Sequence, residues 1–144
     1  MSSTIEIRSV VYQIDGQSYE SRLVYDTKAT AAQPGLLMAP NWMGVSQGAE
    51  DIAKAVAEKG YVVLLADLYG QQIRPSNNDE AGAAMTQLKN DRGLLRKRMQ
   101  AGLDQLLSQA DVSLDVSRIA TVGFCFGGCC PVEPARTDYV LETA

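Results

Sequence analysis

A cysteine stands at the centre of a five-residue motif that can generate a nucleophile. Gly123-Phe124-Cys125-Phe126-Gly127 has the form Gly-x-nucleophile-x-Gly. The motif follows an apolar run, 118–124, that predicts a buried strand, and Gly127-Gly128 can open a helix, as a nucleophile elbow requires. The glycines leave room for the sharp turn from strand to helix. The spacing therefore predicts that the Cys125 thiol attacks a carbonyl carbon.

Backbone groups at such an elbow also favour this chemistry. A thiol at a helix N-terminus has its thiolate stabilised by the partial positive charge of the helix. The backbone N–H of Phe126 would point toward the oxyanion that develops on the attacked carbonyl. A second interpretation stays open, because free cysteine is often only a small buried apolar residue beside a glycine-rich turn.

Histidine is absent, which limits every mechanism that this chain can use. Its 144 residues hold 13 Lys and Arg, 17 Asp and Glu and no His, for a net charge of −4. Histidine is the usual general base at neutral pH and the commonest metal ligand. The thiols of Cys125, Cys129 and Cys130 do not complete a four-ligand zinc site, and a redox or metal role for them is the weakest alternative. Glycine-rich phosphate-binding motifs are also absent, so we expect no metal and no cofactor.

Composition and charge narrow the class of protein further. With 46% apolar and 21% charged residues, the chain is typical of globular domains rather than of disordered or coiled-coil chains. The acidic balance argues against nucleic-acid binding, and we interpret the basic cluster of Lys89, Arg92, Arg96, Lys97 and Arg98 as a solvated helix face. A small-molecule substrate is the expected partner.

Neither an export signal nor a membrane-spanning segment is recognisable. The N-terminus lacks a basic start and a long apolar stretch, and the longest apolar run, 61–66, is far shorter than the roughly 20 residues that cross a bilayer. An odd, clustered set of three cysteines cannot form a framework of paired disulfides. We therefore expect a cytoplasmic protein without membrane contact.

The remaining patterns predict strands that alternate with helices. Alternating residues over 5–10 and a strand-like run over 18–25 flank Asp15-Gly16, which is a hairpin signal. Apolar runs at 35–39 and 61–66 predict buried strands, and helical spacing over 49–57 follows a possible Ser46 cap and precedes a stop at Gly60. A further helical segment carries an apolar stripe over 94–107. This order predicts an α/β fold with a mostly parallel sheet and helices on both faces.

Three separated blocks resemble the dienelactone hydrolases, a family of the α/β-hydrolase fold. The blocks are Pro34-Gly35-Leu36-Leu37-Met38-Ala39-Pro40-Asn41-Trp42-Met43-Gly44, then Gly60-Tyr61-Val62-Val63-Leu64-Leu65-Ala66-Asp67-Leu68-Tyr69-Gly70, and finally Val122-Gly123-Phe124-Cys125-Phe126-Gly127-Gly128. The resemblance covers about 18–130. It implies a hydrolase of small esters or lactones, with Cys125 as nucleophile and the backbone amides of Phe126 and Trp42 as oxyanion hole.

The chain departs from the family pattern at two places. Asn41 occupies a position that is often acidic in the family, where the carboxylate helps to generate the thiolate. Asparagine cannot act as that base, although its amide could orient the thiol or the substrate by hydrogen bonding. Alternatively, Asn41 is only a neutral loop residue. Only 19 residues follow Cys125 and none is histidine, whereas the fold orders its triad as nucleophile, acid, histidine. Pro131 and Pro134 interrupt the expected next helix. We therefore expect one partial domain over 1–144, with an atypical tail at 129–144, truncated after the elbow.

Two functions follow from this interpretation. The first is a thiol hydrolase that is impaired in turnover, because no positioned base activates water for deacylation. The alternative is a non-catalytic binding or partner module that retains half of the fold. Ending after the last parallel strand would leave an exposed sheet edge, through which self-association is possible. Arg74 either approaches a substrate carboxylate or is a solvated loop charge.

Overall fold

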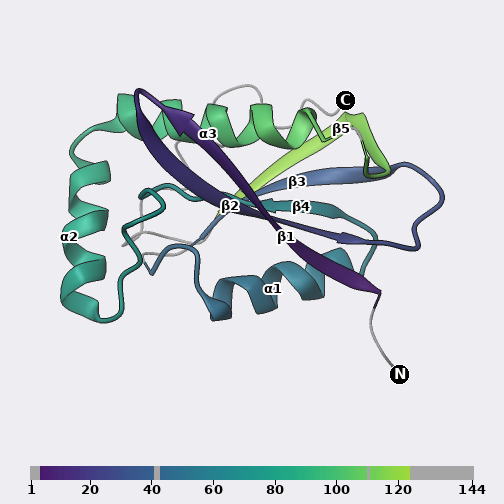
Figure 1. Ribbon diagram of the computed structural model, residues 1–144, viewed down its shortest axis with the longest axis horizontal. Coiled ribbons are helices and arrows are strands. Elements are labelled where there is room, and N and C mark those ends of the chain that lie inside the picture. The colour runs from purple at the N-terminus through teal and green to yellow at the C-terminus, as the bar shows by residue number, and fades with distance from the viewer. Residues whose placement is uncertain (1–3, 41–42, 110, 124–144) are drawn as a thin grey trace.

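A mixed five-stranded sheet with helices on both faces forms the described part of the chain, residues 4–40, 43–109 and 111–123 of a computed structural model (Figure 1). The elements, in chain order, are β1 (Ile5–Ile14), β2 (Gln17–Asp26), β3 (Gln33–Ala39), α1 (Gln47–Ala57), β4 (Val62–Leu65), α2 (Asn78–Lys89), α3 (Arg92–Leu107) and β5 (Leu114–Gly123). The strands lie in the order β1-β2-β4-β3-β5. The predicted α/β fold is confirmed.

The N-terminal hairpin forms where the sequence predicts it. Its turn residues Asp15 and Gly16 have φ angles of 53° and 84°, the positive values of a tight two-residue turn. The antiparallel ladder runs without a break from Ile14↔Gln17 to Ile5↔Asp26. The alternation along β1 sends Ile5 and Ile7 toward the face that α1 covers, and Val10 toward the opposite core.

The sheet changes from antiparallel to parallel at β4. β4 pairs antiparallel with β2 and parallel with β3, and β3 pairs parallel with β5. All four residues of β4 are buried, as expected for a strand covered on both faces. The hairpin accounts for the antiparallel half of this sheet, and the parallel half is the part that leads to the predicted site.

Local signals set the ends of α1. The Ser46 side chain accepts a hydrogen bond from the Ala49 backbone N–H at 3.2 Å, which is the predicted N-cap. Gly60 has a φ of 103°, a conformation that glycine adopts without the strain that a side chain would add. Ser46 therefore sets the start of α1, and Gly60 lies in the turn that leads from α1 to β4.

The segment after Asn77 forms two helices, not one continuous segment. α2 ends at Lys89, and α3 begins after Asp91, whose side chain accepts a hydrogen bond from the Leu94 N–H at 3.0 Å. Among the described residues, no helix is long and apolar enough to cross a membrane.

Arg98 contradicts the prediction of a solvated basic face. Its side chain is buried, with 7% exposed, and its guanidinium lies 5.2 Å from the centre of the Tyr19 ring. It donates a hydrogen bond to the Leu68 carbonyl at 2.8 Å. The charge is therefore part of the core beneath the turn after β4, whereas Lys89, Arg92, Arg96 and Lys97 are exposed as predicted.

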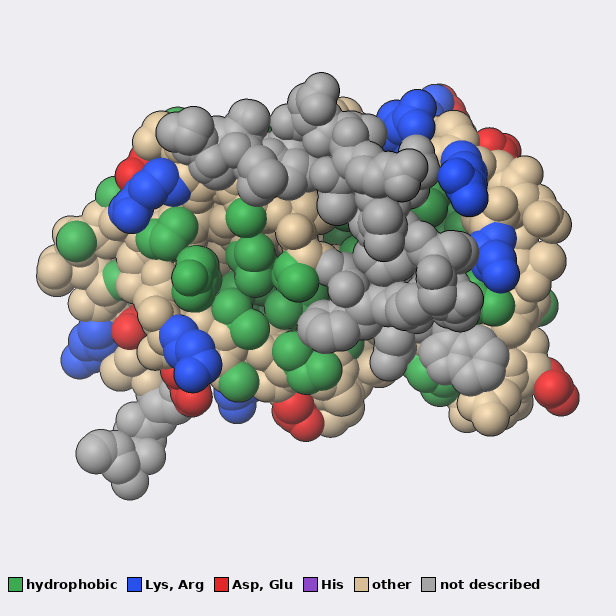
Figure 2. Space-filling model, turned by 180° about the vertical axis from the view of Figure 1, so that it is seen from behind, with side chains coloured by type: hydrophobic (Ala, Val, Ile, Leu, Met, Phe, Trp, Pro, Cys, Tyr) green, Lys and Arg blue, Asp and Glu red, His purple; other side chains and the backbone are tan. Residues whose placement is uncertain are grey.

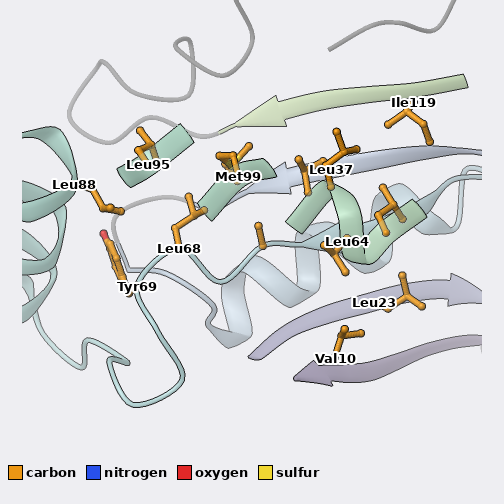
Figure 3. Close-up of a cluster of buried hydrophobic side chains, with 14 of the residues drawn as sticks. Val10, Leu23, Leu37, Leu64, Leu68, Tyr69, Leu88, Leu95, Met99 and Ile119 are labelled. Atoms are coloured by element: carbon orange, nitrogen blue, oxygen red, sulfur yellow. The ribbon is translucent and has the colours of Figure 1, made fainter. Parts of the chain in front are cut away.

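Two apolar clusters hold the helices to the sheet. The larger one joins Leu37 and Leu64 of the sheet to Met99 and Leu106 of α3, and all four are fully buried. Figure 3 shows Leu37, Leu64 and Met99 within this cluster. Gly102 permits this contact, since a Cβ there would lie 3.3 Å from Leu37 Cδ1. The smaller cluster lies under α1. Seen from behind, the molecule also carries a patch of hydrophobic side chains on its surface (Figure 2).

Candidate active site

The predicted site residues lie outside the part of the chain that the structure describes. These are Asn41, Trp42, Cys125 and Phe126, and the same holds for Cys129 and Cys130. The structure does describe the strand ends from which they depart and the turn that lies beside those ends. These strand ends and this turn form the frame of the candidate site.

Two adjacent strand ends lead to the predicted residues. β3 and β5 are parallel neighbours, and their last paired residues are Ala39 and Gly123. Asn41 follows two residues after Ala39, and Cys125 follows two residues after Gly123. Since neighbouring strands lie about 4.8 Å apart, both segments start from one point on the carboxyl edge. In open α/β sheets this edge is where ligands bind.

The turn after β4 borders the same edge. Ala66 continues the ladder, because its N–H donates to the Met38 carbonyl at 2.9 Å. Gly44, on the loop that follows β3, packs against the Tyr69 ring. Its φ is 75°, and a Cβ on it would lie 3.1 Å from Tyr69 Cδ2. The loop after β3 therefore returns against the turn formed by residues 67–70.

Asp67 organises this turn from within. Its carboxylate is 1% exposed and accepts hydrogen bonds from the backbone N–H groups of Tyr69 at 3.1 Å, Gly70 at 2.9 Å and Glu20 at 2.9 Å. The Arg74 guanidinium lies 3.1 Å from the same carboxylate. Because its oxygens are used in these contacts, Asp67 holds the turn onto β2 and is not placed to act as a catalytic acid.

A buried hydroxyl pair continues the network below Asp67. The Asp67 N–H donates to Ser21 Oγ at 2.9 Å, and Ser21 Oγ lies 2.7 Å from the Tyr12 hydroxyl. Burial raises the pKa of Tyr12 to about 12 and outweighs the opposing effect of the Ser21 hydrogen bond. Tyr12 therefore stays neutral at physiological pH and links β1 to the turn.

Arg74 and Glu20 fasten the outer side of the turn. Arg74 donates to the Gly70 carbonyl at 3.1 Å and to the Glu20 carbonyl at 3.0 Å. Hydrogen bonds from Gln71 and Ser9 lower the pKa of Glu20, and the Arg22 charge adds to this effect. Arg74 is therefore neither a solvated loop charge nor free to bind a substrate carboxylate, since its guanidinium is bound within the protein.

Sequence reasoning missed this network. Its one visible signal is an aspartate directly after a buried strand, at Asp67. The partners of that aspartate are separated from it by 47 residues at Glu20 and by 7 at Arg74, and no periodicity relates such positions. Within residues 4–40, 43–109 and 111–123, no group of three His, Cys, Asp or Glu side chains is arranged to hold a metal ion.

Two open cavities lie elsewhere on the described surface, and neither is lined by Ala39 or Gly123. One of about 410 Å³ lies between the hairpin turn and the loop after β4 and is lined by Gly16, Gln17, Ser18, Gln72 and Ile73. The other, of about 580 Å³, lies between β1 and α3 and is lined by Gln13, Ile14, Gly93, Arg96, Lys97, Gln100, Ala101 and Asp104.

The fold and the paired strand ends define a protein of the α/β-hydrolase class. Residues 21–144 match the model of the dienelactone hydrolase family. The chain belongs to this family, and its resemblance to the family is confirmed.

Individual relatives agree with this assignment. A protein of Bradyrhizobium sp, described as a probable 2-oxo-3-(5-oxofuran-2-ylidene)propanoate lactonase, is 32% identical over 129 residues, which are 87% of this chain and 50% of that protein. Two solved structures, m3DLH and a dienelactone hydrolase-like promiscuous phosphotriesterase from metagenomic libraries, each give a TM-score of 0.82. They are 30% and 28% identical, and each comparison covers 93% of this chain and 55% of the other. The chain spans about half the length of these relatives.

Proposed function

We propose that this protein cleaves small esters or lactones with Cys125 as its nucleophile. The observation that carries the proposal is the pairing of Ala39 with Gly123 at the carboxyl edge of the sheet. From these two residues depart the segments that hold Asn41 and Trp42 on one side and Cys125 on the other. Membership of the dienelactone hydrolase family supports the same chemistry.

The acylation step needs only groups on these two segments. The Cys125 thiolate attacks the carbonyl carbon, so that a C–S bond forms and the carbonyl electron pair moves onto oxygen. The backbone N–H groups of Phe126 and Trp42 hydrogen-bond this oxyanion. When the carbonyl re-forms, the C–O bond to the leaving group breaks and the leaving alkoxide takes a proton from water. The product is a thioester on Cys125.

Deacylation is the slow step in this proposal. Water must attack the thioester, and the 144 residues contain no histidine that would remove a proton from that water. Asn41 cannot replace it, because an amide donates and accepts hydrogen bonds without acting as a base. We therefore expect one turnover followed by a stable acyl-enzyme.

The substrate class comes from the relatives. The Bradyrhizobium relative is described as a lactonase for an oxofuran-ylidene propanoate, and a lactone is a cyclic ester that a thiolate opens by the same attack. We extend this class to the present chain as small esters and lactones. The proposed step is written with neither a cofactor nor a metal.

A second candidate is a non-catalytic partner module. The chain spans about half the length of its relatives, and its lack of histidine favours a role that needs no catalytic base. The interrupted single domain, the atypical tail at 129–144 and the cytoplasmic setting stay predictions. Sequencing the coding DNA past codon 144 in all three frames tests the interruption.

Pre-steady-state kinetics separate the two functions. Mixing the full chain with p-nitrophenyl acetate should release a burst of one equivalent of p-nitrophenolate, with little turnover afterwards. The Cys125→Ala variant should lose the burst, whereas the matched Cys129→Ala variant should keep it. Equal behaviour of all three proteins would contradict catalysis and favour the partner module.

A further inference from the structure

We propose that two copies of this chain associate through the outer edge of β1, pairing antiparallel about Ser9 to join their sheets. β1 is the terminal strand of the sheet order, and no described strand lies on its outer side. At ten residues it is long for an edge strand. This inference is independent of the proposed function.

The register of the hairpin shows which backbone groups face outward. The Thr27 N–H donates to the Thr4 carbonyl at 3.0 Å, so the pair next to the β1–β2 ladder is a hydrogen-bonded one. Hydrogen-bonded and non-hydrogen-bonded pairs alternate along an antiparallel ladder. Even-numbered residues of β1 therefore bond to β2, while the N–H and C=O groups of Ile7, Ser9, Val11 and Gln13 point away from the sheet.

Three of the usual protections of an edge strand, a bulge, a proline and a lysine, are missing from β1. Its two charged residues, Glu6 and Arg8, are even-numbered, so their backbone groups bond to β2. The Arg8 guanidinium forms an ion pair with the Asp111 carboxylate at 2.6 Å. Val11 leaves 56% of its surface exposed on the α1 face. Such an edge is a ready template for another strand.

The strand is complementary to itself. An antiparallel copy centred on Ser9 places Val11 opposite Ile7 of the second copy, and the twofold axis repeats this apolar pair. Centring the pairing on Arg8 would place two guanidinium groups opposite each other, which is destabilising. The Ser9 register overlaps nine of the ten residues of β1, with Arg8 opposite Val10. A second copy of this chain therefore fits the edge in length, hydrogen bonding and side chains.

The association should be weak and specific to this edge. A single strand pair is smaller than the roughly 800 Å² per partner of a stable complex, so we expect a dissociation constant of about 1–100 µM. Sedimentation equilibrium over a concentration series should show the mass rise from 15.5 kDa toward twice that value. Val11→Lys should weaken association at least about tenfold, because a charge then faces Ile7 twice in each dimer.

The matched control for this variant lies on β5. Val116 is 61% exposed on β5, so Val116→Lys adds the same charge at the opposite edge and should leave the association unchanged. Circular dichroism checks that both variants fold. A chain that stays at 15.5 kDa throughout, or one that dissociates with Val116→Lys and not with Val11→Lys, would overturn the proposal.

Cysteine scanning tests the register separately. Two copies of residue 9 would form a hydrogen-bonded pair with Cα atoms about 5.5 Å apart, within the range that a disulfide bridges. Two copies of residue 11 would be about 14 Å apart, four residues along the strand. Ser9→Cys should therefore cross-link on oxidation much faster than Val11→Cys, and the native cysteines are common to both variants. Equal cross-linking rates would contradict the Ser9 register.

Discussion

Removing the Asp67 carboxylate tests the network that holds the turn beside the candidate site. In Asp67→Ala, the backbone N–H groups of Glu20, Tyr69 and Gly70 lose their acceptor, and Arg74 loses its ion-pair partner. In Asp67→Asn, one acceptor oxygen remains. The amide nitrogen then faces either the Glu20 N–H or the Tyr69 and Gly70 N–H groups, and those groups lose their acceptor. The two variants therefore remove the interactions in stages.

The expected magnitude follows from the number of groups left without a partner. Each buried donor that loses its acceptor costs about 1–3 kcal/mol. Because water reaches part of an opened turn, the total cost is less than the sum over the three donors. We expect a loss of about 3–5 kcal/mol for Asp67→Ala and about 2–3 kcal/mol for Asp67→Asn. This is a large fraction of the 5–15 kcal/mol that typically stabilises a domain.

Urea unfolding, followed by far-ultraviolet circular dichroism, measures these changes. The control is Asp104→Asn, since Asp104 is exposed on α3 and its hydrogen bond to Gln100 at 3.0 Å survives the substitution. Its effect should stay within about 0.5 kcal/mol. A loss below about 1 kcal/mol for Asp67→Ala would refute the view that this carboxylate holds the turn.

Three further predictions use the same unfolding assay. Gly70→Ala should cost about 1–2 kcal/mol, because φ is +120° and the new Cβ would overlap the Gln17 side chain, whereas Gly48→Ala within α1 should be neutral or stabilising. Ser46→Ala should cost about 1 kcal/mol through the lost α1 cap, and an unchanged stability would contradict that assignment. The raised pKa of Tyr12, about 12, favours the folded state below pH 10, and this contribution is lost as pH rises from 10 to 12. Wild type should therefore lose up to about 2–3 kcal/mol more over this range than Tyr12→Phe, and parallel pH profiles would argue against it.

Local sequence signals predict most of the elements of this fold. The Asp15-Gly16 turn, the Ser46 cap and the stop at Gly60 each depend on neighbouring residues, and all three are confirmed. The break between α2 and α3 is not predicted, because the apolar stripe over 94–107 indicates one helical segment after the turn at 74–79. The Asp91 side chain caps the second helix by accepting a hydrogen bond from the Leu94 N–H, and the apolar periodicity does not indicate this boundary.

The side-chain network around the turn could not be predicted from local patterns. Arg98 occupies a helix position among exposed cations, and only the close packing of α3 on the sheet buries it above Tyr19. Asp67 meets Glu20 because β2 and β4 are neighbours, which is a property of the topology. The prediction for Cys125 depends on the elbow motif and on the strand that precedes it. The structure describes that strand as far as Gly123, and the role of Cys125 stays a prediction.

Locating the acyl group on the protein identifies the nucleophile. The full chain is incubated with p-nitrophenyl acetate, quenched in acid, digested and analysed by peptide mass spectrometry. We expect one acetyl group on Cys125, formed faster than on Cys129 or Cys130. It should persist, because the 144 residues contain no histidine to assist its hydrolysis. An unmodified Cys125, or equal acetylation of all three cysteines, would contradict the assignment of Cys125 as the nucleophile.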